Sequence, residues 1–448
     1  MEIFIKLSQF LLSLSLLIVL HELGHFIPAK LFKTRVEKFY LFFDAKFSLI
    51  KKKIGDTEYG IGWLPLGGYV KIAGMIDESM DKEQMSLPPQ PWEFRSKPAW
   101  QRLIIMLGGV TVNFILAFVI YIGMAYVYGD FYLKNEELKD GVWVTNSVLE
   151  SAGIHTGDKI VAVDGDKITR FEPSVNEKVL MGHHIVVERN GVEQTVTLPE
   201  NFINRFIDSD MKSSLMTIRV PFVVGGFMEN SPNKDNVKLK DIILSIDGKP
   251  MRYFDQVKTF IDQNKNRTFS AVVLRDEKPT NVTLKSGAEG LGIGLGELTE
   301  DNLTRLGYYK FSREDYGFFE SIPVGIKKGN ERLAGYGKQL KAIFTPSTGA
   351  YKGVGGFKAI FDIFPREWSW EAFWGITALL SIMLGVMNLL PIPALDGGHV
   401  MFLLYEIITR RKPSDKFMEY AQITGFVILI ALVLFANGND IYKAIIGK

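Results

Sequence analysis

The 448-residue chain contains no cysteine. Disulfide bonds are therefore excluded, as are metal sites built from thiolates, which leaves histidine and carboxylate side chains as the available metal ligands. The chain also lacks a strong charge of either sign, because 52 lysine and arginine residues face 50 aspartate and glutamate residues. The net charge of +2 argues against nucleic acid as the main partner.

Hydrophobic residues make up 47% of the chain and are concentrated in a few blocks, which is typical of a membrane protein with a soluble insert. The fold class that we predict is a multi-pass α-helical membrane protein with four transmembrane helices, so the lipid bilayer is an expected partner. The first block lacks the basic start and the small-residue cleavage site of a signal peptide, and we expect it to be a retained helix. The four spans are expected at about residues 3–29, 103–128, 372–390 and 418–436.

The first apolar block ends in the motif His-Glu-Leu-Gly-His at residues 21–25. His21 and His25 lie one turn apart on one face of a helix, so both imidazoles can reach one metal ion, and Glu22 can take a proton from an attacking water. A chance match or a pair of packed core histidines is the alternative. The position of the motif favours a zinc site, because ionisable side chains at the end of an apolar span are costly unless they are functional.

A second motif follows the third span, where residues 388–398 read Asn-Leu-Leu-Pro-Ile-Pro-Ala-Leu-Asp-Gly-Gly. Cationic residues after the first and third spans place both of these ends on the cytoplasmic side. Asp396 alone would be a helix-end turn residue. Because the topology brings it to the same face as His21 and His25, it is expected to complete a zinc site with one open position. In the second span, Gly109 and Asn113 allow close helix contact and one hydrogen bond within the membrane.

Residues 36–75 have the composition of strands, and the segment 59–72 is apolar and interrupted by glycines. One interpretation is a small hairpin packed on the membrane surface. The other is an edge strand near the active site that pairs with an extended substrate. The pattern alone favours neither.

The region between the second and third spans contains an internal repeat, because residues 157–165 align with residues 240–248. Each copy has a turn, an apolar strand and an Asp-Gly hairpin signal. The copies resemble PDZ domains over about 80 residues each, and PDZ domains bind extended peptide ends by strand addition. A spacer or a size filter with an unoccupied groove is the alternative. Residues 311–370 include a basic, amphipathic pattern that fits a helix in the membrane interface, and a solvated helix packed on its own domain is the alternative.

Together, the two motifs, the four spans and the repeat resemble the site-2 protease family, and in particular its bacterial RseP type. The resemblance implies that His21, His25 and Asp396 bind a catalytic Zn²⁺ and that Glu22 is the general base. It further implies that Asn388 positions the substrate or stabilises an oxyanion. The β element that pairs with substrate corresponds by resemblance to Gly67, Gly68, Tyr69, Val70 and Lys71.

The activity implied by the resemblance is regulated intramembrane proteolysis of single-pass membrane proteins, such as anti-sigma factors after a first cut and leftover signal peptides. The active site would lie near the cytoplasmic face of the bacterial inner membrane. The PDZ domains would lie in the periplasm and screen substrates, with a possible peptide or protein ligand. The alternatives are a membrane-anchored zinc protease that cuts soluble loops and a PDZ receptor without catalysis, but the apolar setting of the motif and the presence of Glu22 and Asp396 disfavour them.

The expected parts of the chain follow from these assignments. They are a first transmembrane helix (1–30), a cytoplasmic-face β element and loop (31–98), a second helix (99–128), two PDZ-like domains (129–220 and 221–310), an amphipathic segment (311–370), a third helix with its motif (371–398), a cytoplasmic loop (399–417), and a fourth helix with a tail (418–448).

Overall fold

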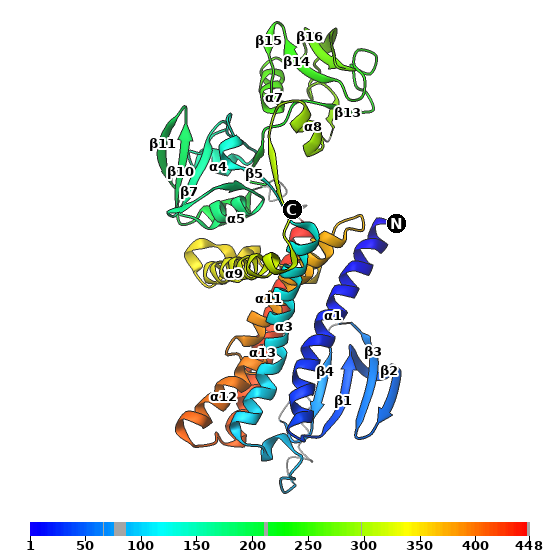
Figure 1. Cartoon of the computed structure of the whole chain (residues 1–448), viewed down its shortest axis with the longest axis vertical. Coiled ribbons are helices and arrows are strands. Elements are labelled where there is room, and N and C mark those ends of the chain that lie inside the picture. The colour runs from blue at the N-terminus through cyan, green and yellow to red at the C-terminus, as the bar shows by residue number, and fades with distance from the viewer. Residues whose placement is uncertain (66, 76–86, 210–213, 297, 446–448) are drawn as a thin grey trace. The chain divides into compact units, whose positions relative to one another are not determined.

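The fold is described from a computed structural model of the chain, which describes residues 1–65, 67–75, 87–209, 214–296 and 298–445 (Figure 1). The chain divides into two compact units. The first unit comprises residues 1–129, 315–341 and 352–448, and the second comprises residues 130–314 and 342–351.

The first unit contains helices α1 (Glu2–Leu31), α3 (Ala99–Tyr128), α11 (Trp370–Leu389) and α13 (Asp415–Ile445). Each contains a stretch that is long and apolar enough to cross a membrane. They overlap the four spans expected from the sequence. Helix α3 packs against both α1 and α11, and these three helices form the packed centre of the unit (Figure 1).

Helices α1 and α3 approach closely because glycines face each other where they meet. A Cβ atom on Gly24 would collide with the backbone of Gly108, and one on Gly109 would collide with the imidazoles of His21 and His25. Small residues allow two helix backbones to come this near inside a membrane. Gly109 therefore leaves the space in which the two histidines lie.

Buried polar side chains join the helices of this unit. The Ser381 hydroxyl donates to the backbone oxygen of Asn113 at 2.7 Å, and Thr377 Oγ1 lies 2.9 Å from Ser13 Oγ. All four residues are fully buried. Such hydrogen bonds between helices satisfy polar groups that have no water to pair with.

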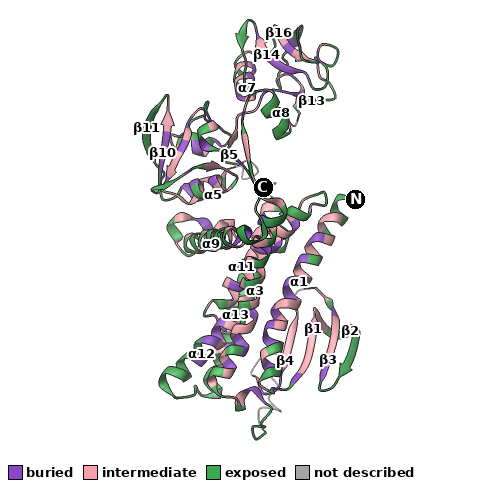
Figure 2. Ribbon diagram, in the orientation of Figure 1, coloured by how far each residue is buried: buried purple, intermediate pink, exposed green. Residues whose placement is uncertain are grey.

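The strands expected at residues 36–75 form a four-stranded sheet beside α1 (Figure 1). Its order is β2-β3-β1-β4, in which β1 is parallel to β3 and antiparallel to β4. The outer strand β2 is largely exposed (Figure 2), and β4 forms the other edge, next to α1. The strands are β1 (Val36–Leu41), β2 (Phe43–Ile54), β3 (Thr57–Leu64) and β4 (Tyr69–Ile72). Residues 76–86 of the expected polar loop lie outside the described residues, and after them comes the short helix η1 (Phe94–Ser96).

The second unit contains two modules whose four-stranded sheets have the same strand order, and each module has its own apolar core. The sheet of the first has the order β11-β10-β7-β8, and that of the second has the corresponding order β17-β16-β14-β15. The first module contains β5 (Asp130–Lys134), η2 (Asn135–Glu137), β6 (Val142–Val144), α4 (Ser147–Ser151), β7 (Lys159–Val163), β8 (Asp166–Lys167), β9 (Arg170–Phe171), α5 (Ser174–Met181), β10 (His184–Arg189), β11 (Val192–Thr197), α6 (Phe202–Asp208) and β12 (Met216–Ile218). The second contains β13 (Val224–Phe227), β14 (Ile242–Ile246), β15 (Lys249–Pro250), α7 (Phe254–Gln263), β16 (Thr268–Arg275), β17 (Lys278–Lys285) and β18 (Ile293–Leu295).

Equivalent ion pairs occur in the two modules. Asp158 pairs with Arg189, and Asp241 pairs with Arg275, each at 2.6 Å. Both aspartates also accept a backbone hydrogen bond at 2.8 Å from the residue three positions earlier. The turns at residues 155–158 and 238–241, which are 83 residues apart, therefore share the same hydrogen bond and ion pair.

The boundary expected between the modules requires a correction. The sequence analysis ended the second domain at residue 310, but Leu303 of α8 (Glu300–Arg305) and Tyr309 are buried in the core of the first module. Strand β19 (Phe311–Glu314) then pairs with β5 at the start of the unit. The chain thus returns to the first module because these apolar side chains complete its core, and the second module is an insertion.

The rest of the first unit contains a long helix and three short ones. In α9 (Phe318–Ile343), Gly325 and Gly329 pack against α3, because a Cβ on either would collide with Ile122 or Phe118. A helix α12 (Asp396–Thr409) occupies much of the range that we expected to be a loop at 399–417. It forms because Val400 and Leu403 are buried, whereas the two glycines in its first turn hide the helical pattern in the sequence. The other short helices are α10 (Phe357–Asp362) in the first unit, η3 (Pro346–Thr348) in the second, and η4 (Ala350–Gly353), which includes residues of both units.

The glycine contact between α1 and α3 generates a prediction about stability. Gly24→Ala should lower the stability of the purified protein in detergent by about 1–3 kcal/mol, because the added methyl group forces the helices apart. Gly123→Ala is the matched control, since nothing lies within 4 Å of a Cβ at that position of α3. Thermal denaturation of both variants checks this, and equal midpoints would contradict the close contact.

Candidate metal centre

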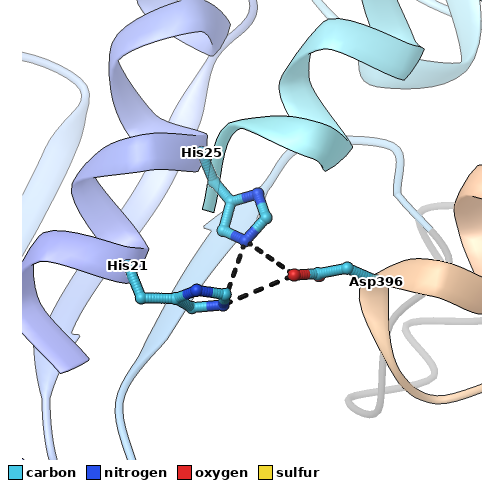
Figure 3. Close-up of side chains that lie close together, drawn as sticks. All are labelled: His21, His25 and Asp396. Carbon is cyan, nitrogen blue, oxygen red and sulfur yellow. Dashed lines mark hydrogen bonds and ion pairs between the residues drawn. The ribbon is translucent and has the colours of Figure 1, made fainter. Parts of the chain in front are cut away.

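Two histidines of α1 and the first residue of α12 meet at one point (Figure 3). The Nε2 atoms of His21 and His25 lie 3.3 Å apart. Asp396 Oδ2 lies 3.4 Å from His21 Nε2 and 3.3 Å from His25 Nε2. Both histidines are buried, so their side chains are largely shielded from water. The residues expected from the sequence are therefore brought together.

The triangle has the dimensions of one face of a tetrahedral zinc site. Nitrogen and oxygen ligands bind zinc at about 2.0–2.2 Å, which places tetrahedral ligands roughly 3.3–3.6 Å apart. In addition, Asp396 Oδ2 is buried and has no hydrogen-bond partner in the described part of the chain. A buried carboxylate oxygen without a partner is unfavourable unless a cation binds it. The three atoms could hold one metal ion and leave a fourth position open.

Helix α3 orients His25 through a backbone oxygen. His25 Nδ1 lies 2.8 Å from the carbonyl oxygen of Ile105, to which it donates a hydrogen bond. With the proton on Nδ1, the Nε2 lone pair is free for a metal. Sequence reasoning missed Ile105, because a backbone acceptor has no side-chain signal.

The motif at residues 388–398 places Asn388, as well as Asp396, beside His21. Asn388 lies near the end of α11, with Nδ2 3.2 Å from His21 Nε2. The turn between them is compact, because a Cβ on Gly397 or Gly398 would collide with the backbone of residues 389–393. Gln422 of α13 accepts a hydrogen bond from the Ala394 amide at 3.2 Å, which connects this turn to α13.

Strand β4 lies beside Glu22. The Glu22 side chain comes within 3.6 Å of the place that a Cβ on Gly68 would occupy, and the Val70 backbone amide interacts with the Glu22 carboxylate. Gly67 precedes this contact in the turn into β4. The edge of the sheet therefore faces the proposed base through its backbone.

The side chains of Tyr69 and Lys71 are engaged within the sheet. The Tyr69 hydroxyl donates to Asp44 at 2.8 Å, and its ring stacks on those of Tyr40 and Phe43. Burial raises the pKa of Tyr69, and the bond to Asp44 raises it further, so this hydroxyl stays protonated. Lys71 pairs with Glu37 at 3.4 Å. We therefore expect an extended ligand at β4 to contact the backbone of the strand rather than these two side chains.

Comparison with known proteins identifies the family. Residues 9–432 match the model of peptidase family M50. The chain belongs to this family. It is 28% identical to a Campylobacter jejuni protein named as a zinc metalloprotease, over 98% of this chain and 93% of the relative. It is 27% identical to the "Regulator of sigma E protease" of Haemophilus influenzae, over 98% of this chain and 99% of the relative.

Membership of the family establishes the class of the protein. The site-2 protease family consists of zinc metalloproteases, so this protein is a zinc-dependent protease. Its apolar helices agree with a protein embedded in a membrane. The expected family, enzyme class and cofactor are thereby confirmed.

The triangle generates a prediction about metal content. Asp396→Ala should lower zinc affinity by more than about tenfold and reduce protease activity in parallel, because it removes one of the three proposed ligand atoms. Zinc bound per chain after dialysis is the measurement. Glu371→Ala, which removes an exposed carboxylate at the start of α11, is the control and should keep its zinc. Full zinc content in the Asp396 variant would assign the third ligand elsewhere.

Proposed function

We propose that this protein is an intramembrane zinc protease that cuts the membrane-spanning segments of single-pass membrane proteins. The triangle of His21, His25 and Asp396, formed at the end of an apolar helix, carries the proposal. These three residues bind the zinc ion, with the fourth position open toward substrate and water. A protease for soluble loops would not need its ligands at the end of a membrane span.

The residues around the zinc have separate roles in the proposed reaction. Zinc, when bound, supplies a Lewis acid that polarises the scissile carbonyl and makes water a better nucleophile. Glu22 takes the proton from the attacking water and delivers it to the leaving amide nitrogen. The Asn388 amide, which lies within 3.2 Å of His21 Nε2, is placed to donate to the carbonyl oxygen as negative charge develops on it.

The substrate must be extended before it is cut, because the amides of a helix are hydrogen-bonded internally and shielded. Strand β4 is an edge strand of the sheet and lies beside Glu22, and an extended segment could pair with its backbone. The glycines at 67 and 68 let the substrate backbone approach closely. Pairing of this kind replaces the hydrogen bonds that the substrate helix loses.

The two modules of the second unit are proposed to be PDZ domains in the periplasm of a bacterium, with the catalytic site near the cytoplasmic face of the inner membrane. Their matching sheets and ion pairs support a common PDZ-like fold. They would screen substrates or bind a peptide end. Anti-sigma factors after a first cut and leftover signal peptides are the proposed substrates, and the name of the Haemophilus relative, a regulator of sigma E protease, supports the first class.

The role of the base generates a prediction. Glu22→Gln keeps the size of the side chain but cannot accept a proton, so cleavage should fall by roughly 10²–10⁴-fold while zinc stays bound. The assay follows cleavage of a tagged single-span peptide by purified protein in detergent, with and without a zinc chelator. Zinc content is the internal control. A variant that keeps normal turnover would exclude Glu22 as the base.

The role of β4 generates a second prediction. Val70→Pro removes a backbone donor at the strand edge and should reduce cleavage far more than Val70→Ala, which keeps the backbone amide. Tyr69→Phe should have a mild effect, because the ring keeps its stacking.

Crosslinking tests the same pairing directly. Because the chain has no cysteine, single cysteines at positions 67–71 can be joined to one in the substrate span without background reaction. Crosslinks that form only in the two modules of the second unit would show that β4 does not bind substrate.

A further inference from the structure

The structure contains a buried polar contact to His21 that the proposed mechanism does not use. Asn113, in the middle of the apolar helix α3, lies with its Nδ2 atom 3.0 Å from His21 Nδ1. Both residues are buried, and Asn113 is fully inaccessible to solvent. The Oδ1 atom of Asn113 has no hydrogen-bond partner in the described part of the chain. An amide in this setting is costly, which calls for a reason.

Zinc binding decides which atom of the Asn113 amide must face His21. When Nε2 of a neutral imidazole binds zinc, the ring proton is on Nδ1, and Nδ1 needs a hydrogen-bond acceptor. The amide nitrogen of Asn113 is a donor and cannot fill this role, whereas the oxygen can. The two orientations of an amide have nearly the same shape and differ by rotation about the last side-chain bond.

We propose that Asn113 is a positioning residue for the zinc site, whose side-chain oxygen accepts the Nδ1–H hydrogen bond of His21 in the zinc-loaded protein. This inference rests on the proposed function, since it takes His21 as a zinc ligand. It gives His21 the same kind of support that the Ile105 carbonyl gives His25. Both acceptors are then supplied by α3.

Two neighbouring contacts hold Asn113 in place for this role. Ser381 of α11 donates to the Asn113 backbone oxygen at 2.7 Å and fixes this turn of α3. One turn earlier, Gly109 has no side chain to push the imidazoles away. Gly109 therefore leaves room for the imidazole of His21, whose Nδ1 atom the Asn113 amide contacts.

The experiment compares zinc affinity in the full chain, purified in detergent, by competition with a chelator of known affinity. Asn113→Leu removes the acceptor at similar size and should weaken zinc binding by about 10–100-fold. Asn113→Asp supplies only acceptor oxygens and should bind zinc within a few-fold of the wild type. Thr377→Val is the matched control, because it alters another fully buried polar residue of the bundle, which has no hydrogen bond to His21.

The aspartate variant separates the proposed role from the alternatives. If Asn113 served only helix packing, leucine and aspartate would both leave the affinity unchanged or both reduce it. If its nitrogen donated to His21, aspartate would be the weaker binder of the two. Either result would overturn the proposal. Should the leucine variant fail to fold, Asn113→Ala replaces it, since alanine fits within the space of asparagine.

A further variant separates this inference from the proposed function. His21→Ala should lower zinc affinity more than any change at position 113, because it removes a ligand atom. If His21→Ala leaves the affinity unchanged, the ligand assignment itself is wrong. If His21→Ala weakens binding but Asn113→Leu does not, only the role of Asn113 is refuted.

Discussion

The close contact of α1 with α3 at Gly24, Gly108 and Gly109 is the constraint on which the rest of the catalytic unit depends. Inside a membrane there is little hydrophobic force between helices, so association relies on tight packing and hydrogen bonds. The glycines let the two backbones touch. This close approach brings the Ile105 carbonyl and the Asn113 amide of α3 within hydrogen-bond distance of the two imidazoles of α1. A wider spacing would leave both histidines without partners on that side.

The same constraint explains why the polar residues of the bundle are arranged in pairs. An unpaired polar group in this environment costs far more than one in water. Ser13 faces Thr377, and Ser381 reaches the backbone of Asn113. Asp396 Oδ2 is one of six buried side-chain atoms of the described residues without a hydrogen-bond partner, and its neighbours are His21 Nε2 at 3.4 Å and His25 Nε2 at 3.3 Å. A cation bound by all three residues would supply the missing partner of this oxygen.

The sequence alone predicted the parts of the site that have a side-chain signature. The spacing of His21 and His25 predicts two metal ligands on one helix face, and the expected topology of four spans predicts that Asp396 lies beside them. Ile105 could not be predicted, since any residue carries a backbone oxygen. Asn113 was expected to make one hydrogen bond within the membrane, but nothing in the sequence identifies His21 as its partner.

The wrong predictions about the fold have a similar physical origin. Residues 300–310 follow the second module in sequence, and nothing local to Leu303 or Tyr309 shows which of two apolar cores they join. Only the pairing of β19 with β5 resolves this, and a contact between strands so far apart in sequence is not encoded in either strand alone. Helix α12 was missed because Gly397 and Gly398 are poor helix formers, yet they are needed to let the turn before it fold tightly.

The position of β4 shows how a water-requiring reaction is compatible with an apolar surrounding. A free sheet edge in a membrane would leave backbone groups unpaired, which is unfavourable. Here the edge lies against α1, and the Val70 amide has the Glu22 carboxylate as a partner. This edge of the sheet therefore lies beside Glu22, the proposed base. Under the proposed function, a substrate segment can unfold at low cost only where the chemistry takes place, so the requirement for backbone hydrogen bonds itself selects the cleavage position.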